Sequence, residues 1–168
     1  VAGNTVRLVR PGGRDEALEG YNEGAWWVQD AAAAMPARLL DQLAGKQVID
    51  LCAAPGGKTA QLIAAGANVT AIDSNRKRLD RLRRNLKRLN MPAKMVLSDG
   101  RSFVPETPVD AILLDAPCSA TGTIRRRPDI LDAVTVPISA VCKLCKPYFI
   151  RIVSTALERA ISLLFIIF

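Results

Sequence analysis

Residues 47–59 read Q-V-I-D-L-C-A-A-P-G-G-K-T, and the expected fold class follows from them. The apolar run at 47–51 predicts a short buried strand, and a helix is expected over 59–65. The small residues between them predict a tight turn, over which a ligand can lie against the backbone. The start of the helix offers N–H donors and a partial positive charge to a carboxylate. The stretch therefore predicts a strand–turn–helix unit that is suited to binding a ligand.

The same alternation of strands and helices continues along the chain. We expect strands over 68–72, 94–97 and 109–114 and a helix over 74–89. Strands that alternate with helices at this spacing indicate an α/β fold with a parallel sheet and helices on both of its faces.

Acidic residues recur near the carboxyl ends of the predicted strands: Asp50, Asp73, Asp99 and Asp115. Ligands of open parallel sheets bind beyond these ends, so the shared placement indicates a binding site. Asp73 follows Gly56 by 17 residues, and its carboxylate is placed to accept hydrogen bonds from both hydroxyls of a ribose. A purely structural role stays open, in which Asp73 caps the helix that follows.

Two phosphate-binding motifs are excluded in this stretch. Gly57-Lys58-Thr59 resembles the end of a phosphate-binding loop, but that motif needs a glycine where this chain has Cys52. The dinucleotide fingerprint G-x-G-x-x-G is also missing. A nucleotide hydrolase is therefore rejected.

Composition narrows the classes of function further. The chain has 168 residues, which suits one domain that folds without disulfides or metal. It contains no histidine, which excludes a histidine-based catalytic triad and imidazole zinc ligands. Lysine and arginine total 23 against 16 acidic residues, and the net charge of +7 favours a polyanionic partner, nucleic acid first.

The cysteines and the chain ends carry weaker signals. Cys142 and Cys145 form a C-x-x-C pair, but a structural zinc needs four ligands and no second pair stands nearby, so no metal is expected. Nothing near the N-terminus resembles a signal peptide, so we expect a cytoplasmic protein without disulfides. The apolar run at 161–168 is far shorter than the ~20 residues of a membrane span, so no membrane is expected as a partner.

Several motifs together resemble one known family. They are D-L-C-A-A-P-G-G-K-T at 50–59, A-I-D at 71–73, S-D at 98–99 and D-A-P-C-S-A-T-G-T at 115–123, preceded by E-G-A-W-W-V-Q-D at 23–30. This set resembles the RNA (cytosine-5) methyltransferases, most closely the bacterial Sun/Fmu group that methylates 16S ribosomal RNA. The resemblance implies a Rossmann-like, S-adenosylmethionine-dependent methyltransferase fold, truncated here after the fourth strand.

The resemblance also implies roles for particular residues. The loop residues would hold the methionine part of S-adenosylmethionine: Cys52, Ala53, Ala54, Pro55, Gly56, Gly57 and Lys58. Asp73 would hold the ribose and Asp99 the adenine region, whereas Asp115 would face both the cofactor and the target base. The substrate would be RNA, with ribosomal RNA favoured.

Cytosine C5 is a poor nucleophile, so the implied reaction needs a cysteine thiolate that adds to C6. Cys118 follows Pro117 beside the proposed methyl donor. In the RNA-modifying family the Pro-Cys cysteine is understood to help release the product, and a cysteine in a Thr-Cys-Ser context attacks the base. In the analogous DNA enzymes the Pro-Cys cysteine itself attacks. Asp115 and Cys118 are therefore the candidate catalytic residues.

The match ends near Ile130. This chain has no Thr-Cys-Ser, and a faint echo of that strand over 152–156 places Ala156 at the position of the nucleophile. We therefore expect weak or absent methyl transfer from a fragment of the catalytic domain, whose fourth strand would form an open apolar edge. The alternative is a non-catalytic remnant that binds cofactor or RNA without turnover.

We divide the chain into a pre-core segment at 1–45, a methyltransferase core at 46–130 and a divergent tail at 131–168. Within the pre-core segment, residues 5–10 alternate like a strand. A helix is expected over 29–44, with Asp30 as its cap and Pro36 as a kink or break.

Basic residues concentrate in two short stretches. Residues 76–88 contain eight of them, and leucines at helical spacing predict that one face of this helix packs while the other is displayed. A solvated helix face and a surface for RNA phosphates both fit this pattern. Arg125, Arg126 and Arg127 follow the Cys118 loop, so RNA contact is favoured there.

Overall fold

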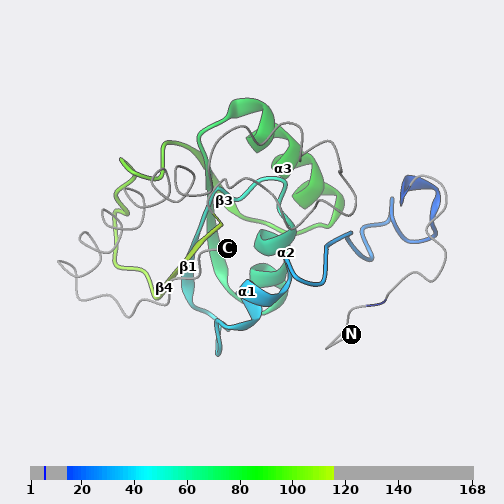
Figure 1. Ribbon diagram of the computed structural model, residues 1–168, viewed down its shortest axis with the longest axis horizontal. Coiled ribbons are helices and arrows are strands. Elements are labelled where there is room, and N and C mark those ends of the chain that lie inside the picture. The colour runs from blue at the N-terminus through cyan, green and yellow to red at the C-terminus, as the bar shows by residue number, and fades with distance from the viewer. Residues whose placement is uncertain (1–5, 7–14, 116–168) are drawn as a thin grey trace, which may run out of the picture.

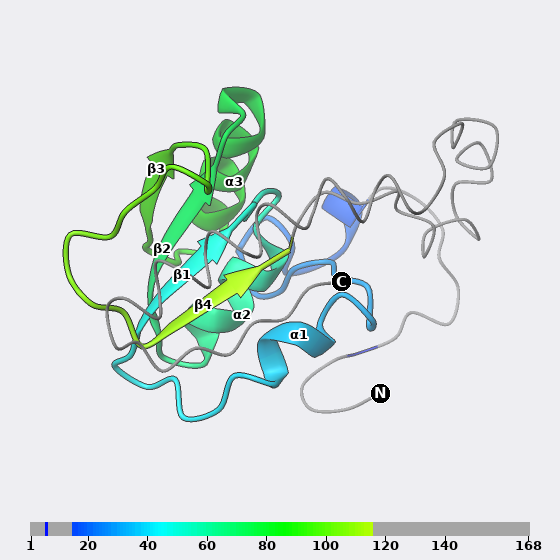
Figure 2. The ribbon, with the colours of Figure 1, turned by 60° about the vertical axis from the view of Figure 1, so that its left-hand side comes forward.

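The computed structural model describes residue 6 and residues 15–115. Four parallel strands form one sheet in the order β3-β2-β1-β4 (Figure 2). Their bounds are Gln47–Leu51 for β1, Asn68–Asp73 for β2, Lys94–Leu97 for β3 and Ala111–Leu114 for β4. This parallel sheet and its helices confirm the α/β class.

Helices follow the strands much as predicted. A short 3-10 helix spans Asp15–Ala17, and the α-helices are α1 at Met35–Arg38, α2 at Gly57–Ala64 and α3 at Arg76–Arg88. Leucines at helical spacing place one face of α3 in the core, because Leu79, Leu82 and Leu86 are all buried. The side chain of Asn75 caps α3 by accepting a hydrogen bond from the Arg78 backbone N–H at 3.1 Å. The cap is therefore Asn75 and not Asp73.

The three α-helices lie on one face of the sheet (Figure 1). Val48 and Leu113 point to this face and pack against Leu62 of α2. On the other face, Ile49 and Ile112 cluster with apolar side chains of the segment that links β3 to β4, Phe103 and Val109 among them. Helices on both faces were expected, so within the described residues this expectation is wrong: an irregular segment covers part of the second face.

The helix predicted over 29–44 is largely absent. The Asp30 carboxylate accepts a hydrogen bond from the Ala32 N–H at 2.9 Å, which holds the chain in turns over 31–34. Only the four residues of α1 are helical, and Pro36 stands in the first turn, where its missing N–H costs nothing. Proline therefore starts this helix and does not kink it.

β4 hydrogen-bonds to β1 and to no other strand of the described part, so it lies at an edge of this sheet. All four of its residues are nevertheless buried. Several predictions lie outside the described residues: the strand at 5–10, Cys118, the run 125–127 and the tail at 131–168. None of the helices found in the described residues is long and apolar enough to cross a membrane.

Candidate cofactor site

The loop between β1 and α2 is held by the rest of the sheet and by α3. Cys52 adopts a positive φ of 61°, and the Ala53 N–H donates to the Ile72 carbonyl of β2 at 3.0 Å. Two side chains of α3 then donate to loop carbonyls: Arg78 Nη2 to Ala54 O at 3.2 Å and Asn85 Nδ2 to Pro55 O at 2.8 Å. The path of the loop is therefore fixed before any ligand binds.

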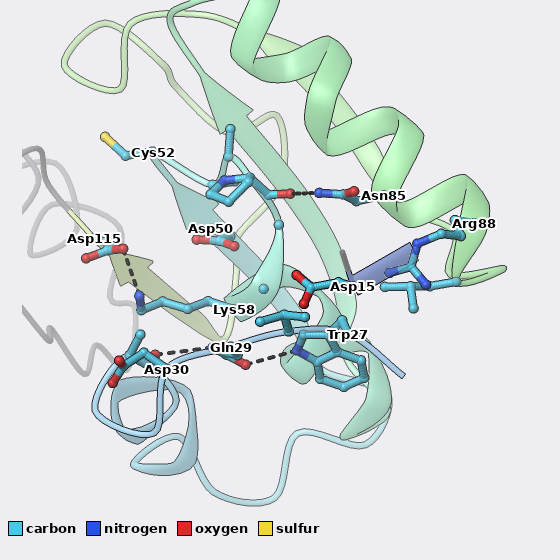
Figure 3. Close-up of a pocket in the computed structure, with 18 of the residues that line it drawn as sticks. Asp15, Trp27, Gln29, Asp30, Asp50, Cys52, Lys58, Asn85, Arg88 and Asp115 are labelled. Atoms are coloured by element: carbon cyan, nitrogen blue, oxygen red, sulfur yellow. Dashed lines mark hydrogen bonds and ion pairs between the residues drawn. The ribbon is translucent and has the colours of Figure 1, made fainter. Parts of the chain in front are cut away.

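The loop borders a cavity of about 310 Å³ at the carboxyl ends of β1 and β4 (Figure 3). Every residue of the loop from Cys52 to Lys58 lines it, together with Asp50 and Asp115. The remaining walls come from the pre-core segment and from α3: Asp15, Tyr21, Trp27, Val28, Gln29, Asp30, Ala33, Asn85, Arg88 and Leu89. The structure thus brings together on one cavity eight of the ten residues predicted to bind the cofactor, all except Asp73 and Asp99.

Asp50 is the buried acid of this cavity. Its side chain has no solvent exposure, and the Thr59 hydroxyl donates to one carboxylate oxygen, Oδ2, at 2.6 Å. The other oxygen, Oδ1, is buried and has no hydrogen-bond partner among the described residues. Burial is the main cause that raises the pKa of Asp50 from 3.8 to about 7, against the opposing effect of the Thr59 hydrogen bond. In its ionised form Asp50 therefore provides an unpartnered acceptor that a cationic donor on a ligand would satisfy.

The N-terminus of α2 provides donors on the same cavity. The first hydrogen bond of the helix runs from the Ala60 N–H to the Gly56 carbonyl at 2.8 Å. The N–H groups of Gly57, Lys58 and Thr59 precede this bond, and the partial positive charge of the helix start acts there. Donors for an anion and an unpartnered acceptor thus border one cavity.

An ion pair joins the helix start to the end of β4. Lys58 Nζ lies 2.8 Å from Asp115 Oδ2, and Figure 3 shows the two side chains meeting at one side of the cavity. The lysine side chain is 12% exposed and that of Asp115 39%, so the aspartate is the accessible partner. Asp115 is therefore positioned by Lys58 while still facing outward.

Asp73 and Asp99 do not line the cavity, in contrast to the residues of the loop. The Asp73 carboxylate is buried and already bound: it accepts from the Asn75 N–H at 2.9 Å, and Arg78 Nη2 lies 3.1 Å from it. Its Oδ2 also accepts a long hydrogen bond of 3.4 Å from the Ala54 N–H, which ties the end of β2 to the loop. Asp99 pairs with Arg101.

Most residues of the opposite wall of the cavity were not predicted from the sequence. Trp27 Nε1 donates to Gln29 Oε1 at 3.0 Å (Figure 3). Gln29 Nε2 donates to Gln61 Oε1 of α2 at 2.7 Å, which fastens the pre-core segment to the core. Arg88, expected to be displayed with the basic face, donates to the Trp26 carbonyl at 3.1 Å and lies 3.9 Å over the Tyr21 ring. The motif at 23–30 was the available signal, since it contains Trp27 and Gln29.

Cys52 is half-buried, and burial is the main cause that raises the pKa of its thiol from 9.0 to about 11. We therefore expect Cys52 to be alkylated by iodoacetamide at pH 8 about a hundredfold more slowly than a cysteine in a free peptide, because the thiolate is the reactive form. Mass spectrometry of the peptide containing residue 52 measures this rate. A rate equal to that of the free peptide would contradict the description of this site.

Within residues 15–115, no group of three or more cysteine, aspartate and glutamate side chains is placed to hold a metal ion. The candidate residues Cys118, Arg125, Arg126 and Arg127 lie outside the described part of the chain.

Residues 37–155 match the family described as 16S rRNA methyltransferase RsmB/F. The chain belongs to this family. Over 132 residues it is 50% identical to "Ribosomal RNA small subunit methyltransferase B" of Cronobacter sakazakii and 47% identical to the protein of that name from Yersinia pseudotuberculosis. Each match covers 76% of this chain and 30% of the relative, so the chain spans less than a third of these relatives.

Solved structures agree with membership of the RsmB/F family. The crystal structure of PH0851 superposes with a TM-score of 0.81 at 29% identity, over 94% of this chain and 37% of that one. NSun6 from Pyrococcus horikoshii, determined with SFG, gives a TM-score of 0.73 at 29% identity, over 85% of this chain and 38% of that one. The predicted resemblance and the predicted fold class are therefore both confirmed.

Proposed function

We propose that this chain is the cofactor-binding part of an S-adenosylmethionine-dependent methyltransferase that acts on C5 of cytosine in RNA, with ribosomal RNA as the favoured substrate. The observation that carries the proposal is the pairing, on one cavity, of the α2 N-terminus with the unpartnered buried oxygen Asp50 Oδ1. An amino-acid group, with one carboxylate and one ammonium, is complementary to this pair. The methionine part of S-adenosylmethionine carries both.

The residues present fit this cofactor. The N–H groups that begin α2 would donate hydrogen bonds to its carboxylate, and the loop from Cys52 to Lys58 would contact its methionine part. Asp73 lies outside the cavity and is bound to the loop through the Ala54 N–H; it would hold the ribose, and Asp99 would approach the adenine region. The domain limits at 46–130 for the core and 1–45 for the pre-core segment belong to the same proposal.

When bound, S-adenosylmethionine supplies an electrophilic methyl group on a sulfonium centre. The protein must then make C5 of cytosine nucleophilic by adding a cysteine thiolate to C6, and later remove the C5 proton and eliminate the thiolate. We propose that Asp115 faces both the cofactor and the base, because the Lys58 ion pair leaves its carboxylate partly exposed on the cavity. Cys118 stands three residues further along the chain and is proposed to act at the step that releases the product.

Photochemical labelling tests the proposed site. Ultraviolet irradiation of the chain with methyl-tritiated S-adenosylmethionine is expected to place the label on the peptide that contains residues 52–58. Unlabelled S-adenosylhomocysteine should abolish this labelling and ATP should not, because the loop lacks the spacing of a phosphate-binding motif. Label displaced by ATP, or confined to peptides outside the cavity, would contradict the proposal.

A second candidate is binding of cofactor or RNA without turnover, and the missing Thr-Cys-Ser favours it for this polypeptide. We expect RNA that contains 5-fluorocytosine to form no denaturation-resistant complex with the chain in the presence of S-adenosylmethionine. A covalent complex that disappears in Cys118→Ala would overturn this expectation and assign the attack to Cys118.

A further inference from the structure

The outer surface of α3 takes no part in the packing of this helix against the core. Leu79, Leu82 and Leu86 fill the core on its inner side. One flank contacts the site, because Asn85 donates to the Pro55 carbonyl of the cofactor loop and Arg88 donates to the Trp26 carbonyl of the pre-core segment. The remaining surface of the helix faces solvent and is almost entirely basic.

Three of these exposed cations form a stripe that lies next to the flank. Lys77, Arg81 and Arg84 stand at positions i, i+4 and i+7, so they follow one another along the same side of the helix over about 10 Å, at 1.5 Å per residue. We call this set the α3 stripe. Within residues 15–115 none of the three forms an ion pair, since the nearby acids Asp73 and Asp80 are paired with other arginines.

The α3 stripe borders the cavity. Arg81 precedes Asn85 by one turn, and Arg84 precedes Arg88 by one turn, so each cation lies directly beside a residue that lines the cavity. Arg78 is also exposed, but it donates to the Ala54 carbonyl of the loop. The remaining exposed basic residues of the helix, Arg76, Arg83 and Lys87, lie on the side of α3 away from this flank. The helix therefore carries two basic sides, of which only one adjoins the site.

We propose that the α3 stripe binds consecutive phosphates of the substrate RNA and thereby guides the target nucleotide toward the cavity. The inference rests on the proposed function, since a cytosine that reaches Asp115 must bring its backbone across the rim of the cavity. Unpaired cations spaced by one helical turn suit a line of phosphates, and arginine donates to phosphate oxygens in a fork geometry. Such contacts recognise the phosphate backbone of the RNA and do not distinguish between base sequences.

Binding of a fluorescein-labelled RNA hairpin with a cytosine-containing loop tests this proposal, measured by anisotropy over a series of salt concentrations. In the stripe variant, Lys77→Gln, Arg81→Gln and Arg84→Gln are combined. In the matched control, Arg76→Gln, Arg83→Gln and Lys87→Gln are combined, which removes the same charge from the same helix. All six side chains are exposed, so neither variant alters the core.

We expect the stripe variant to weaken RNA binding at least about tenfold and to lower the slope of log affinity against log salt by about 2, because roughly three phosphate contacts are lost. The control should weaken binding less than about threefold, through the change in net charge alone. A charge-retaining variant with Arg81→Lys and Arg84→Lys should keep the wild-type slope.

Two outcomes overturn the proposal: equal losses in the stripe variant and the control, or a wild-type chain that does not bind the hairpin. Titration with S-adenosylhomocysteine separates this failure from that of the proposed function. Both triple variants should bind this ligand like the wild type, which also shows that they are folded. A wild-type chain that binds RNA through the stripe but does not bind S-adenosylhomocysteine would refute the proposed function alone.

Discussion

Gly56→Ala is expected to weaken binding of S-adenosylhomocysteine by at least about a hundredfold and to lower the free energy of unfolding by roughly 2–4 kcal/mol. Gly56 precedes α2 with a φ of 108°, a conformation that L-residues rarely adopt. A Cβ at this position would lie 2.5 Å from Leu82 Cδ1. Leu82 is fully buried in the core, so it has no free space to move into.

The clash in Gly56→Ala must therefore be relieved by a shift of the loop. Such a shift would move the N–H groups of α2 away from Asp50, and these two features define the proposed site. Urea unfolding and calorimetric titration measure the two effects. Gly45→Ala is the matched control, because Gly45 also has a positive φ, of 74°, but a Cβ there meets nothing within 4 Å. We expect Gly45→Ala to lower the free energy of unfolding by about 1 kcal/mol and to leave binding of S-adenosylhomocysteine unchanged. A Gly56→Ala chain that binds like the wild type would contradict the account of the loop.

The second large effect concerns the pH dependence of stability, and Asp50 is its origin. Burial raises the pKa of Asp50 from 3.8 to about 7 in the folded chain, whereas the unfolded chain keeps the ordinary value. Between these two values the unfolded state loses its proton and the folded state keeps it. The contribution of Asp50 to the free energy of unfolding is therefore greatest below pH 4, and it is lost as the pH rises to about 7. The loss amounts to roughly 3–5 kcal/mol, from the difference between the two pKa values.

Asp50→Asn should abolish this fall, because the amide does not titrate. We expect the difference in free energy of unfolding between the variant and the wild type to shift by roughly 3–5 kcal/mol in favour of the variant from pH 4 to pH 8. Urea unfolding at several pH values measures it. Asp110→Asn provides a control of opposite sign, because a backbone hydrogen bond from Gln47, aided by Lys46, lowers the pKa of Asp110. If the difference for Asp50→Asn stays constant across this range, the description of Asp50 as a buried acid with a raised pKa is wrong.

Sequence patterns predicted well those strands and helices whose structure depends on their own residues. The bounds predicted for β1 and β3 are those observed, because each is a short apolar run between clear turn signals. The leucine spacing predicted α3 to within two residues at each end. The prediction of a helix over 29–44 is wrong. The alanines of this segment favour a helix, but the hydrogen bond that the Asp30 carboxylate accepts from the Ala32 N–H favours turns.

The residues of the cofactor site could be predicted only where they belong to a sequence motif. The loop 52–58 and Asp115 meet on one cavity, as their positions at strand ends indicated. The unpartnered oxygen of Asp50 depends on how β1 is buried, which no local pattern contains. Arg88 belongs by sequence to a basic helix face, yet contacts with the distant Tyr21 and Trp26 remove it from that face. The spacing of basic residues and leucines therefore identified the two faces of α3, whereas tertiary packing decided the role of Arg88.

Calorimetric titration of the chain with S-adenosylhomocysteine shows whether the carboxyl end of this sheet holds the cofactor. We expect saturable binding at one site by the wild type, loss of that binding in Asp73→Ala, and unchanged binding in Asp110→Ala. Both substitutions remove an ion-paired aspartate, but Asp73 contacts the loop through the Ala54 N–H, whereas Asp110 pairs with Lys46 at the opposite end of the sheet. A folded wild-type chain that gives no binding heat, or equal losses in the two variants, would contradict the claim that the carboxyl end of this sheet holds the cofactor.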